Sequence, residues 1–470
     1  MLLKYFYNQK LAHASYMVGC QALGEAIVID PGRDIDLYQR EAKANDMQIV
    51  GAVETHIHAD YVSGARELAA QTNAKLYLSD EGDADWKYQF AAQHDHQLVK
   101  DGDTFSVGNI RFEVMHTPGH TPEHISLIIT DGANADQPMG IFTGDFVFVG
   151  STGRPDLLEK AAGIAGTAEL GAQQMYQSLQ RFKQLPDYLQ VWPAHGAGSA
   201  CGKGLGSIPS TTVGYEKLFN PMLQIDDEGV FTQTLLDGQP ESPKYFAQMK
   251  KVNKAGPRIL QDMLAPEWLP ANRLPGLLQA RSIVVDTRPA AQFSQRHLPG
   301  TINIPASMLA AWAGWLVKYD QPFYMVIDAE KSATALADLA YIGLDNVGGL
   351  FHTDVIDTLG GEGQALQSYA EISPQNLQQL IGEQEVTLID VRNDAEWAEE
   401  RIPNARHYML GYLADHADEI ANGKPIAVHC RSGARSAVGA SVLKAHGAKE
   451  VINMTGGILA WQAAGLPVTN

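Results

Sequence analysis

The sequence predicts an α/β protein built from several domains, and three observations support this prediction. Metal-binding residue types follow strand-like apolar runs at four places in the first half of the chain. A strand pattern that ends in an Asp occurs twice in the second half, as part of an internal repeat. The chain of 470 residues is also too long for one hydrophobic core, because domains average about 150 residues. Three domains are therefore expected.

Composition and charge narrow the functions that the chain can have. The formal net charge of -19 and the lack of a basic patch argue against nucleic acid or an anionic membrane as a partner, because phosphate groups bind clustered Lys and Arg. The N-terminal segment lacks an apolar run typical of a signal peptide, and no run of about 20 apolar residues occurs. We therefore expect a cytoplasmic protein without a membrane segment.

The three cysteines are too few and too far apart in sequence for a disulfide framework, so reduced thiols are expected. Cys20 lies beside an apolar strand pattern and is expected to pack in a core. Cys201 follows a histidine motif in a stretch of small residues, which would let its thiol approach an active site. We expect Cys201 to be catalytic there. Cys430 lies near the C-terminus, between a strand-like run and a helix-like pattern.

Changes of pattern along the chain predict the domain boundaries. Strand and helix patterns alternate from Tyr5 to about Lys217, and a turn-rich stretch (DDEGVFTQTLLDGQPESP) then indicates that a first domain covers residues 1–250. In the repeat that follows, IVVDTR matches LIDVR with Asp286 aligned to Asp390, and NVGGL resembles NMTGGI near the ends of the copies. Two similar α/β domains are expected, at residues 256–358 and 372–470.

Candidate metal ligands cluster at the ends of strand-like runs. The segment THIHADY follows the apolar run IVGAV and supplies His56, His58 and Asp60. Side chains at strand ends share one edge of an α/β sheet. Imidazole and carboxylate groups are typical donors of transition-metal sites, so a metal centre is expected. Three further motifs of this kind, HTPGHT, IFTGDF and VWPAHG, supply His120, Asp145 and His195.

Cys430 has the surroundings expected of a reactive thiol. The apolar run PIAVH leads into it and a helix-like pattern follows, so the thiol lies at a helix N-terminus. The helix dipole and Arg435 favour thiolate over thiol and would stabilise a persulfide, which makes Cys430 and Arg435 candidate catalytic residues. The N–H groups of the loop would form an anion-binding nest for substrate, built from Arg431, Ser432, Gly433 and Ala434.

The stretch LIDVRNDAEWAEERIPNA with HCRSGARS resembles the rhodanese family, in which this Cys carries a sulfane sulfur. The resemblance implies a structural role for Asp390 and Arg392. The earlier copy, VVDTRPAAQFSQRHLPGTINIP, resembles the same family, but its equivalent strand ends in Asp328 and it contains no cysteine. We expect an inactive rhodanese copy that packs against or positions the other domains.

The motifs THIHADY, TPGHT, TGDF and PAHG resemble the metallo-β-lactamase superfamily, which includes glyoxalase II and the persulfide dioxygenases. The resemblance implies an αββα sandwich followed by the two rhodanese-like domains. In two-metal hydrolases of the superfamily the motif is HxHxDH, whose last His binds the second metal. Here that position is Tyr61, and a neutral phenol, with a pKa of about 10, is a poor substitute ligand. The second metal site is therefore expected to be damaged.

In persulfide dioxygenases the residues that match His56, His120 and Asp145 bind iron, so the resemblance implies one Fe(II) per chain. Two His and one carboxylate leave coordination positions open for oxygen and substrate. We expect His58, Asp60 and His195 to support these ligands through hydrogen bonds. Arg154 lies where the superfamily places an anion-facing loop, and it either binds substrate or pairs only with Asp156.

Nearly the whole chain resembles persulfide dioxygenase–rhodanese fusions of bacterial sulfide detoxification. The resemblance implies that O2 oxidises a low-molecular-weight persulfide, of glutathione or coenzyme A type, to sulfite, and that Cys430 transfers sulfur to sulfite to give thiosulfate. A homo-oligomer is expected from base rates. One alternative is a dinuclear zinc thioester hydrolase of glyoxalase II type with a sulfurtransferase domain. Another is a sulfide-sensing or sulfur-carrier protein without metal turnover.

Overall fold

The computed structural model describes residues 1–157, 159, 166–239, 241–421 and 423–470, and the chain divides into two compact units. The first unit comprises Met1–Met263 together with Ala340–Gly343. The second comprises Leu264–Leu339 and Leu344–Asn470. Residue 250, at which the sequence pattern places the end of the first domain, lies inside helix α7 (Phe246–Ala255), so the first unit continues past that helix.

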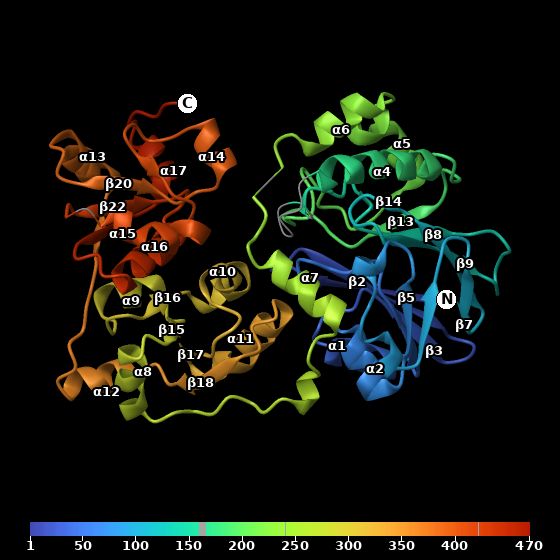
Figure 1. The fold of residues 1–470 in the computed structure, drawn as a ribbon, viewed down its shortest axis with the longest axis horizontal. Coiled ribbons are helices and arrows are strands. Elements are labelled where there is room, and N and C mark those ends of the chain that lie inside the picture. Colours follow the sequence, from blue (N-terminus) through green and yellow to red (C-terminus); the bar gives the residue numbers. More distant parts are fainter. Residues whose placement is uncertain (158, 160–165, 240, 422) are drawn as a thin grey trace. The chain divides into compact units, whose positions relative to one another are not determined.

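The first unit contains two six-stranded sheets (Figure 1). One has the strand order β1-β2-β3-β4-β5-β6, antiparallel from β1 to β3 and parallel from β3 to β6. Its strands are β1 Leu2–Asn8, β2 His13–Cys20, β3 Glu25–Ile29, β4 Gln48–Val53, β5 Lys75–Ser79 and β6 His96–Val99. The other sheet has the order β14-β13-β10-β9-β8-β7. Its strands are β7 Thr104–Val107, β8 Ile110–His116, β9 Ile125–Asp131, β10 Gly140–Gly144, β13 Gln190–Pro193 and β14 Thr211–Thr212.

Helices cover the outer faces of both sheets, which gives a four-layer αββα sandwich (Figure 1). Apolar side chains of β2, β8 and β9 fill the core between the sheets, and Cys20 belongs to this core as its sequence context suggested. Helix α4 shows why a helix covers the second sheet, because its buried residues recur at the three- and four-residue spacing of one helical face. The helices of the first unit are α1 Asp36–Ala44, α2 Ala65–Thr72, α4 Thr167–Phe182, α5 Val213–Phe219, α6 Glu228–Leu236 and α7. A short hairpin joins β11 Val147–Phe148 to β12 Ser151–Thr152.

The second unit contains two parallel sheets. The sheet of the middle domain has the order β16-β15-β17-β18, and that of the C-terminal domain has the order β19-β23-β22-β20-β21. Strands buried on both faces, such as β22, are continuous apolar runs because helices cover parallel sheets on both sides. The middle domain comprises α8 Leu274–Gln279, β15 Ile283–Asp286, α9 Ala290–Gln295, β16 Ile302–Asn303, α10 Leu309–Leu316, β17 Phe323–Val326, α11 Ala329–Tyr341, β18 Val347–Phe351 and α12 Val355–Gly361. The C-terminal domain comprises β19 Ala370–Ile372, α13 Pro374–Gly382, β20 Thr387–Asp390, α14 Asp394–Glu399, β21 Arg406–His407, α15 Ala417–Ile420, β22 Ile426–His429, α16 Ala434–Ala445, β23 Val451–Met454 and α17 Gly457–Ala463.

The two copies of the repeat share this strand order. Asp286 ends β15 and pairs with Arg288, and Asp390 ends β20 and pairs with Arg392 in the same way. The match between NVGGL and NMTGGI has no structural counterpart, because Gly348 and Gly349 lie inside β18 whereas Gly456 and Gly457 follow β23. The predicted α/β fold class is confirmed, as an αββα sandwich followed by two α/β domains that each contain a parallel sheet.

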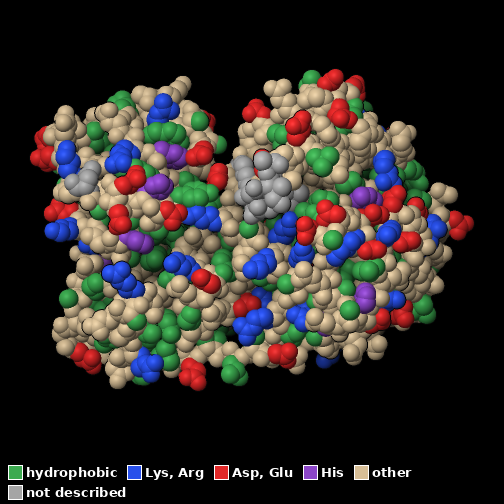
Figure 2. Space-filling model, viewed as in Figure 1, with side chains coloured by type: hydrophobic (Ala, Val, Ile, Leu, Met, Phe, Trp, Pro, Cys, Tyr) green, Lys and Arg blue, Asp and Glu red, His purple; other side chains and the backbone are tan. Residues whose placement is uncertain are grey.

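The distribution of surface charge and the length of the helices bear on whether the chain binds polyanions or spans a membrane. Acidic and basic side chains are interspersed over the face shown in Figure 2. Within the part of the chain that the structure describes, none of the helices is long and apolar enough to span a bilayer.

Candidate metal centre and cysteine loop

Three strand ends bring His56, His120 and Asp145 together. Strands β8, β10 and β13 run in one direction, since β8 and β10 are both antiparallel to β9 and β13 is parallel to β10. Their carboxyl ends therefore share one edge, to which the end of β4 brings His56. The ligand atoms of the three buried side chains all lie within 4.8 Å of one another. Asp145 Oδ2 is 3.4 Å from His120 Nε2 and 4.0 Å from His56 Nε2.

The far nitrogens of both imidazoles are bonded to neighbouring groups. His56 Nδ1–H donates to Thr55 Oγ1 (3.0 Å), and the Thr55 hydroxyl donates to Asp30 Oδ2 (2.8 Å). His120 Nδ1–H donates to the main-chain oxygen of Arg154 (2.9 Å). These bonds assign the proton to Nδ1 in each ring and leave the Nε2 lone pairs free, which is how proteins orient metal-binding histidines.

The triad fits a divalent metal ion. His56 Nε2 and both oxygens of Asp145 are buried and have no hydrogen-bond partner among the described residues. Buried polar atoms without partners are costly, and a metal ion would satisfy all of them. Burial lowers the pKa of His56 well below its usual value, and His58 and His120 lower it further. Burial also lowers the pKa of His120, so both rings are neutral and able to act as ligands.

A second group of donor atoms, from Asp60, His195 and Cys201, lies beside the triad. His195 Nε2 lies 3.2 Å from Asp60 Oδ2 and 3.4 Å from Asp145 Oδ1, and His195 Nδ1–H donates to the Ala12 carbonyl (2.9 Å). Burial raises the pKa of the Cys201 thiol, and the carboxylates of Asp60 and Asp145 raise it further. The structure thus brings Cys201 to the metal centre, but as a neutral thiol.

His58 and Tyr61 are directed toward Asp30 and Glu54. His58 Nε2 is 3.2 Å from Asp30 Oδ1 and 3.3 Å from Glu54 Oε2. The Tyr61 hydroxyl donates to the main-chain oxygen of Asp30 (3.2 Å), and its ring packs 3.8 Å from that of His13. The phenol oxygen, which replaces the last imidazole of HxHxDH, is therefore engaged by the main chain.

Arg154 is fully buried and holds neighbouring segments of the metal centre through hydrogen bonds. Its Nε and Nη2 donate to the two carboxylate oxygens of Asp156 (2.7 and 2.6 Å), and Nη1 donates to the Ala200 carbonyl (3.1 Å). Pairing with Asp156 is one of the two roles expected from the sequence, and substrate binding stays a prediction. Through its carbonyl, Arg154 also orients His120.

Several residues of the site carry no motif that sequence reasoning used. His124 Nε2 accepts from the Asp145 N–H (3.0 Å), and its ring stacks 5.0 Å from that of His56. Asp30 and His13 also contact the histidine segment. Two of them had a sequence signal: His124 lies four residues after His120 in HTPEH, and Asp30 directly follows the apolar run AIVI.

Cys430 lies between β22 and α16, as the sequence pattern predicted. Its buried Sγ accepts from the Gly433 N–H (3.1 Å). The single proton of the Ser436 hydroxyl can point either to Sγ (3.5 Å) or to the Gly433 carbonyl (3.1 Å). Gly433 adopts a positive φ of 95°, which favours glycine. The side chains of its neighbours Arg431, Ser432 and Ala434 are exposed. Ser436 was not singled out from the sequence.

Arg435 forms an ion pair with a carboxylate, which changes the role expected for it at the Cys430 thiol. Its two terminal nitrogens both donate to Glu396, at 2.7 Å each. Glu396 is held by a capping box with Asn393 at the start of α14. The Glu396 carboxylate therefore neutralises much of the Arg435 charge that was expected to stabilise the Cys430 thiolate. Arg435 also fixes the position of the loop through this ion pair.

The middle domain lacks both the thiol and its loop. Asp286 pairs with Val326 in the sheet, and Asp390 pairs with His429. Ile327, and not Asp328, therefore occupies the position of Cys430. Two residues separate β17 from α11, against four between β22 and α16. A connection this short leaves no room for an anion-binding loop.

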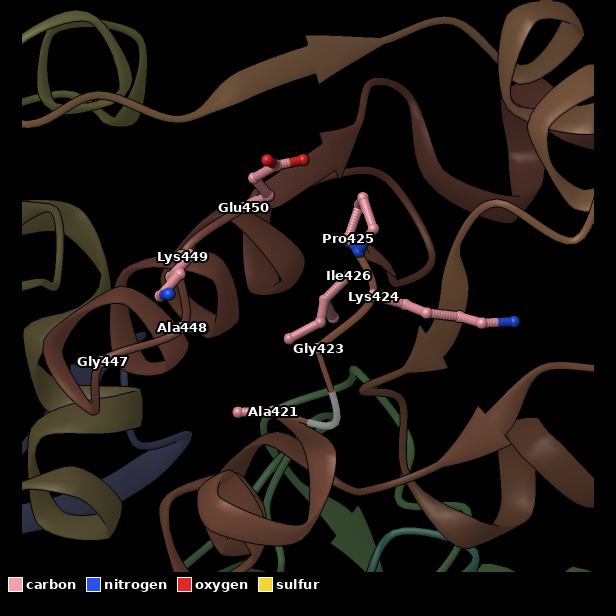
Figure 3. Close-up of a pocket in the computed structure, with 9 residues that line it drawn as sticks. All are labelled: Ala421, Gly423, Lys424, Pro425, Ile426, Gly447, Ala448, Lys449 and Glu450. Atoms are coloured by element: carbon pink, nitrogen blue, oxygen red, sulfur yellow. The ribbon is translucent and has the colours of Figure 1, made fainter.

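A pocket of about 360 Å³ lies in the C-terminal domain (Figure 3). It lies at the amino ends of β22 and β23, whereas Cys430 follows the carboxyl end of β22. The side chain of Lys424 extends away from Lys449, and it donates to the Gln384 carbonyl (3.1 Å). The pocket is lined by Ala421, Gly423, Lys424, Pro425, Ile426, Gly447, Ala448, Lys449 and Glu450.

Comparison with known proteins places these sites in families. A family model of the metallo-beta-lactamase superfamily matches residues 10–195, and a model of the rhodanese-like domain matches residues 373–464. The crystal structure of a metallo-beta-lactamase from Staphylococcus aureus subsp. aureus COL is 42% identical, covers 75% of this chain and 98% of its own, and has a TM-score of 0.67.

Two further relatives each match nearly half of this chain. The mitochondrial persulfide dioxygenase ETHE1 of Bos taurus is 27% identical over 48% of this chain and 78% of its own length. The probable polyketide biosynthesis zinc-dependent hydrolase BaeB of Bacillus velezensis is 27% identical over 45% of this chain and 84% of its own length. The chain therefore belongs to the metallo-β-lactamase superfamily and carries a rhodanese-like domain in its C-terminal part.

Proposed function

We propose that the chain is a persulfide dioxygenase that also transfers sulfur. With O2, and at a single Fe(II) held by His56, His120 and Asp145, it would oxidise the terminal sulfur of a low-molecular-weight thiol persulfide. One persulfide, one O2 and one water give the free thiol, sulfite and two protons. Sulfite then attacks the terminal sulfur of a persulfide on Cys430, the S–S bond breaks, and thiosulfate leaves.

The observation that carries the proposal is a two-His, one-carboxylate donor set in a chain whose histidine motif ends in Tyr61, with the Tyr61 hydroxyl bonded to the Asp30 carbonyl. Iron bound by such a set offers open positions at which O2 and a sulfur anion can meet. The chain itself orients the two imidazoles through Thr55 and Arg154 and keeps the centre buried. The 27% identity to a persulfide dioxygenase supports the same chemistry.

In the C-terminal domain the residues around Cys430 support sulfur transfer. The Gly433 N–H donates to Sγ, and the Ser436 hydroxyl lies within reach of both Sγ and the Gly433 carbonyl. When sulfite takes the outer sulfur, the N–H and a hydroxyl turned to Sγ would stabilise the thiolate that leaves. The match to the rhodanese-like family supports this role. Sulfite made in one part of the chain would be consumed in another, at a raised effective concentration.

The test is to measure O2 uptake, sulfite and thiosulfate with glutathione persulfide and with coenzyme A persulfide. The purified protein should hold about one iron per chain and consume O2 only when a persulfide is present. Cys430→Ser should abolish thiosulfate and leave sulfite formation intact. Cys20→Ser, which removes a thiol from the core between the sheets, is the matched control and should retain both products. Equal loss of both products in Cys430→Ser would contradict separable activities.

A zinc hydrolase with two metals is the second candidate, and one observation favours it. His195 Nε2 and both oxygens of Asp60 lack hydrogen-bond partners within the described residues, so these atoms could hold a second ion. The relative BaeB, a probable polyketide biosynthesis zinc-dependent hydrolase, supports this candidate. Metal analysis after aerobic purification separates the two functions. Two zinc ions per chain with thioester hydrolysis, and without O2 uptake, would replace our proposal.

A further inference from the structure

Asn253, a residue far from every metal motif in sequence, is bonded to the segment that carries His56. It lies on α7 and is 2% exposed. Its amide nitrogen donates to the main-chain oxygens of His58 (2.8 Å) and Tyr61 (2.7 Å). Its amide oxygen accepts from the Ser63 N–H (2.9 Å). All three partners belong to the turn between β4 and α2.

The chemistry of an amide matches this turn closely. Two carbonyls of the turn need donors and one N–H needs an acceptor, and the Asn side chain supplies two N–H groups and one oxygen. The partners therefore also assign which amide atom is nitrogen. A carboxylate in the same place would face two carbonyl oxygens, and an apolar side chain would leave three buried main-chain groups without partners.

The rest of the histidine segment is held from other sides. The Asp30 carboxylate accepts from the Thr55 N–H (2.7 Å) and hydroxyl, and Glu123 Oε1 accepts from the Ile57 N–H (2.7 Å). These bonds fix the first half of the segment, whereas the Asn253 amide fixes the second half.

The end of α7 and the chain beyond it are themselves fastened to α2, which directly follows the turn. Arg66 Nη1 donates to the carbonyls of Gly256 (3.2 Å) and Pro257 (2.6 Å). The buried Glu67 carboxylate accepts from the N–H groups of Leu260 (2.6 Å) and Gln261 (3.3 Å). These hydrogen bonds fix the position of α7 relative to the turn, so that Asn253 stays within hydrogen-bonding distance of its three partners.

We propose that Asn253 is a positioning residue of the metal centre. By holding the backbone from His58 to Ser63 it keeps His56 turned toward Asp145, so the segment is already in its metal-binding form before a metal arrives. The proposal rests on metal binding at the triad that the proposed function requires, but not on which reaction follows.

The test measures metal affinity and coordination in the full-length protein. Wild type, Asn253→Leu and Asn253→Asp are compared by competition of a chelator for Fe(II) and Co(II), and by the visible spectrum of the Co(II) form. Both variants should lower the affinity by about 10- to 100-fold, as expected when a support of a metal ligand is removed. The Co(II) bands should also shift, because His56 is less well oriented.

Phe246→Leu is the matched control, because Phe246 is buried on the same helix and offers no polar group to the turn. It should reduce stability and leave the affinity and the spectrum unchanged. Asn253→Ser keeps one donor and should give an intermediate affinity, and it decides the matter if the Leu variant does not fold. Wild-type affinity and an unshifted spectrum in Asn253→Ser and in any other Asn253 variant that folds would overturn the inference. Failure of the wild type to bind metal would instead overturn the proposed function.

Discussion

Replacing Thr55 by Val should weaken metal binding at a residue that is not itself a ligand. The two side chains have nearly the same shape, so the change removes a hydroxyl and little else. That hydroxyl accepts from His56 Nδ1–H (3.0 Å) and donates to Asp30 Oδ2 (2.8 Å). Without it, His56 has no acceptor at Nδ1 and can place its proton on Nε2, where it blocks the lone pair that a metal needs.

The size of the effect follows from the bonds that are lost. A hydrogen bond to a charged group contributes about 1.5–3 kcal/mol, and a buried N–H left without a partner costs about 1–3 kcal/mol. Because His56 can shift its proton and the Thr55 N–H still donates to Asp30 (2.7 Å), we expect the metal-free protein to lose about 2–4 kcal/mol of unfolding free energy. Metal affinity should fall about 10- to 100-fold, equivalent to about 1.4–2.8 kcal/mol.

Chelator competition at neutral pH measures the affinity, and urea unfolding of the metal-free protein measures the stability. Thr72→Val is the control, because its hydroxyl donates to the Leu68 carbonyl (2.8 Å) within α2. That variant should keep wild-type affinity. If Thr55→Val binds metal as tightly as the wild type while His56→Ala does not bind, the idea that Thr55 orients His56 is refuted.

Three further predictions concern the second unit. Ser436→Ala should slow thiosulfate formation by about tenfold, since it removes a hydroxyl that can turn from the Gly433 carbonyl to the Cys430 thiolate, a bond worth about 1.4 kcal/mol; an unchanged rate in a sulfite-saturated assay would assign Ser436 a structural role. Ile327→Cys in a Cys430→Ser background should yield no thiosulfate, because the loop after β17 is too short, and any turnover above background would contradict the loop argument. Burial lowers the pKa of His429 from 6.5 to about 4, so the folded state resists its protonation. Stability should be full above pH about 6.5 and fall by up to about 3 kcal/mol toward pH 4, and His429→Leu should flatten that part of the urea-unfolding profile; an unflattened profile would show that other groups cause the loss.

Sequence patterns were sufficient to nominate the groups at the metal centre, because functional side chains of α/β proteins gather at the carboxyl ends of strands. His56, His120 and Asp145 each follow a strand, and the structure brings them within 4.8 Å. The groups that orient them could not be nominated in the same way. The Arg154 carbonyl on His120 and the Ala12 carbonyl on His195 belong to the main chain, which has no residue-specific signature.

The C-terminal loop illustrates the same division. The alternation of strand, Cys and helix placed Cys430 correctly at the N-terminus of α16. The pairing of Arg435 with Glu396 has no signal in the sequence, because the two residues are distant along the chain and meet only through the packing of α14 beside the loop. The alignment of Asp328 with Cys430 also required correction, since sheet register and not sequence spacing sets equivalence.

By itself, the sequence determined the α/β class, the presence of a metal centre and a cysteine loop, and the residue types that supply their chemistry. These depend on local periodicity and on side chains that are visible in the chain. Only the tertiary structure decided which atoms orient the ligands, that the Tyr61 hydroxyl is bonded to the main chain, and that Asn253 holds the histidine turn from α7. Such contacts join segments far apart in sequence, and their geometry arises only when the layers pack.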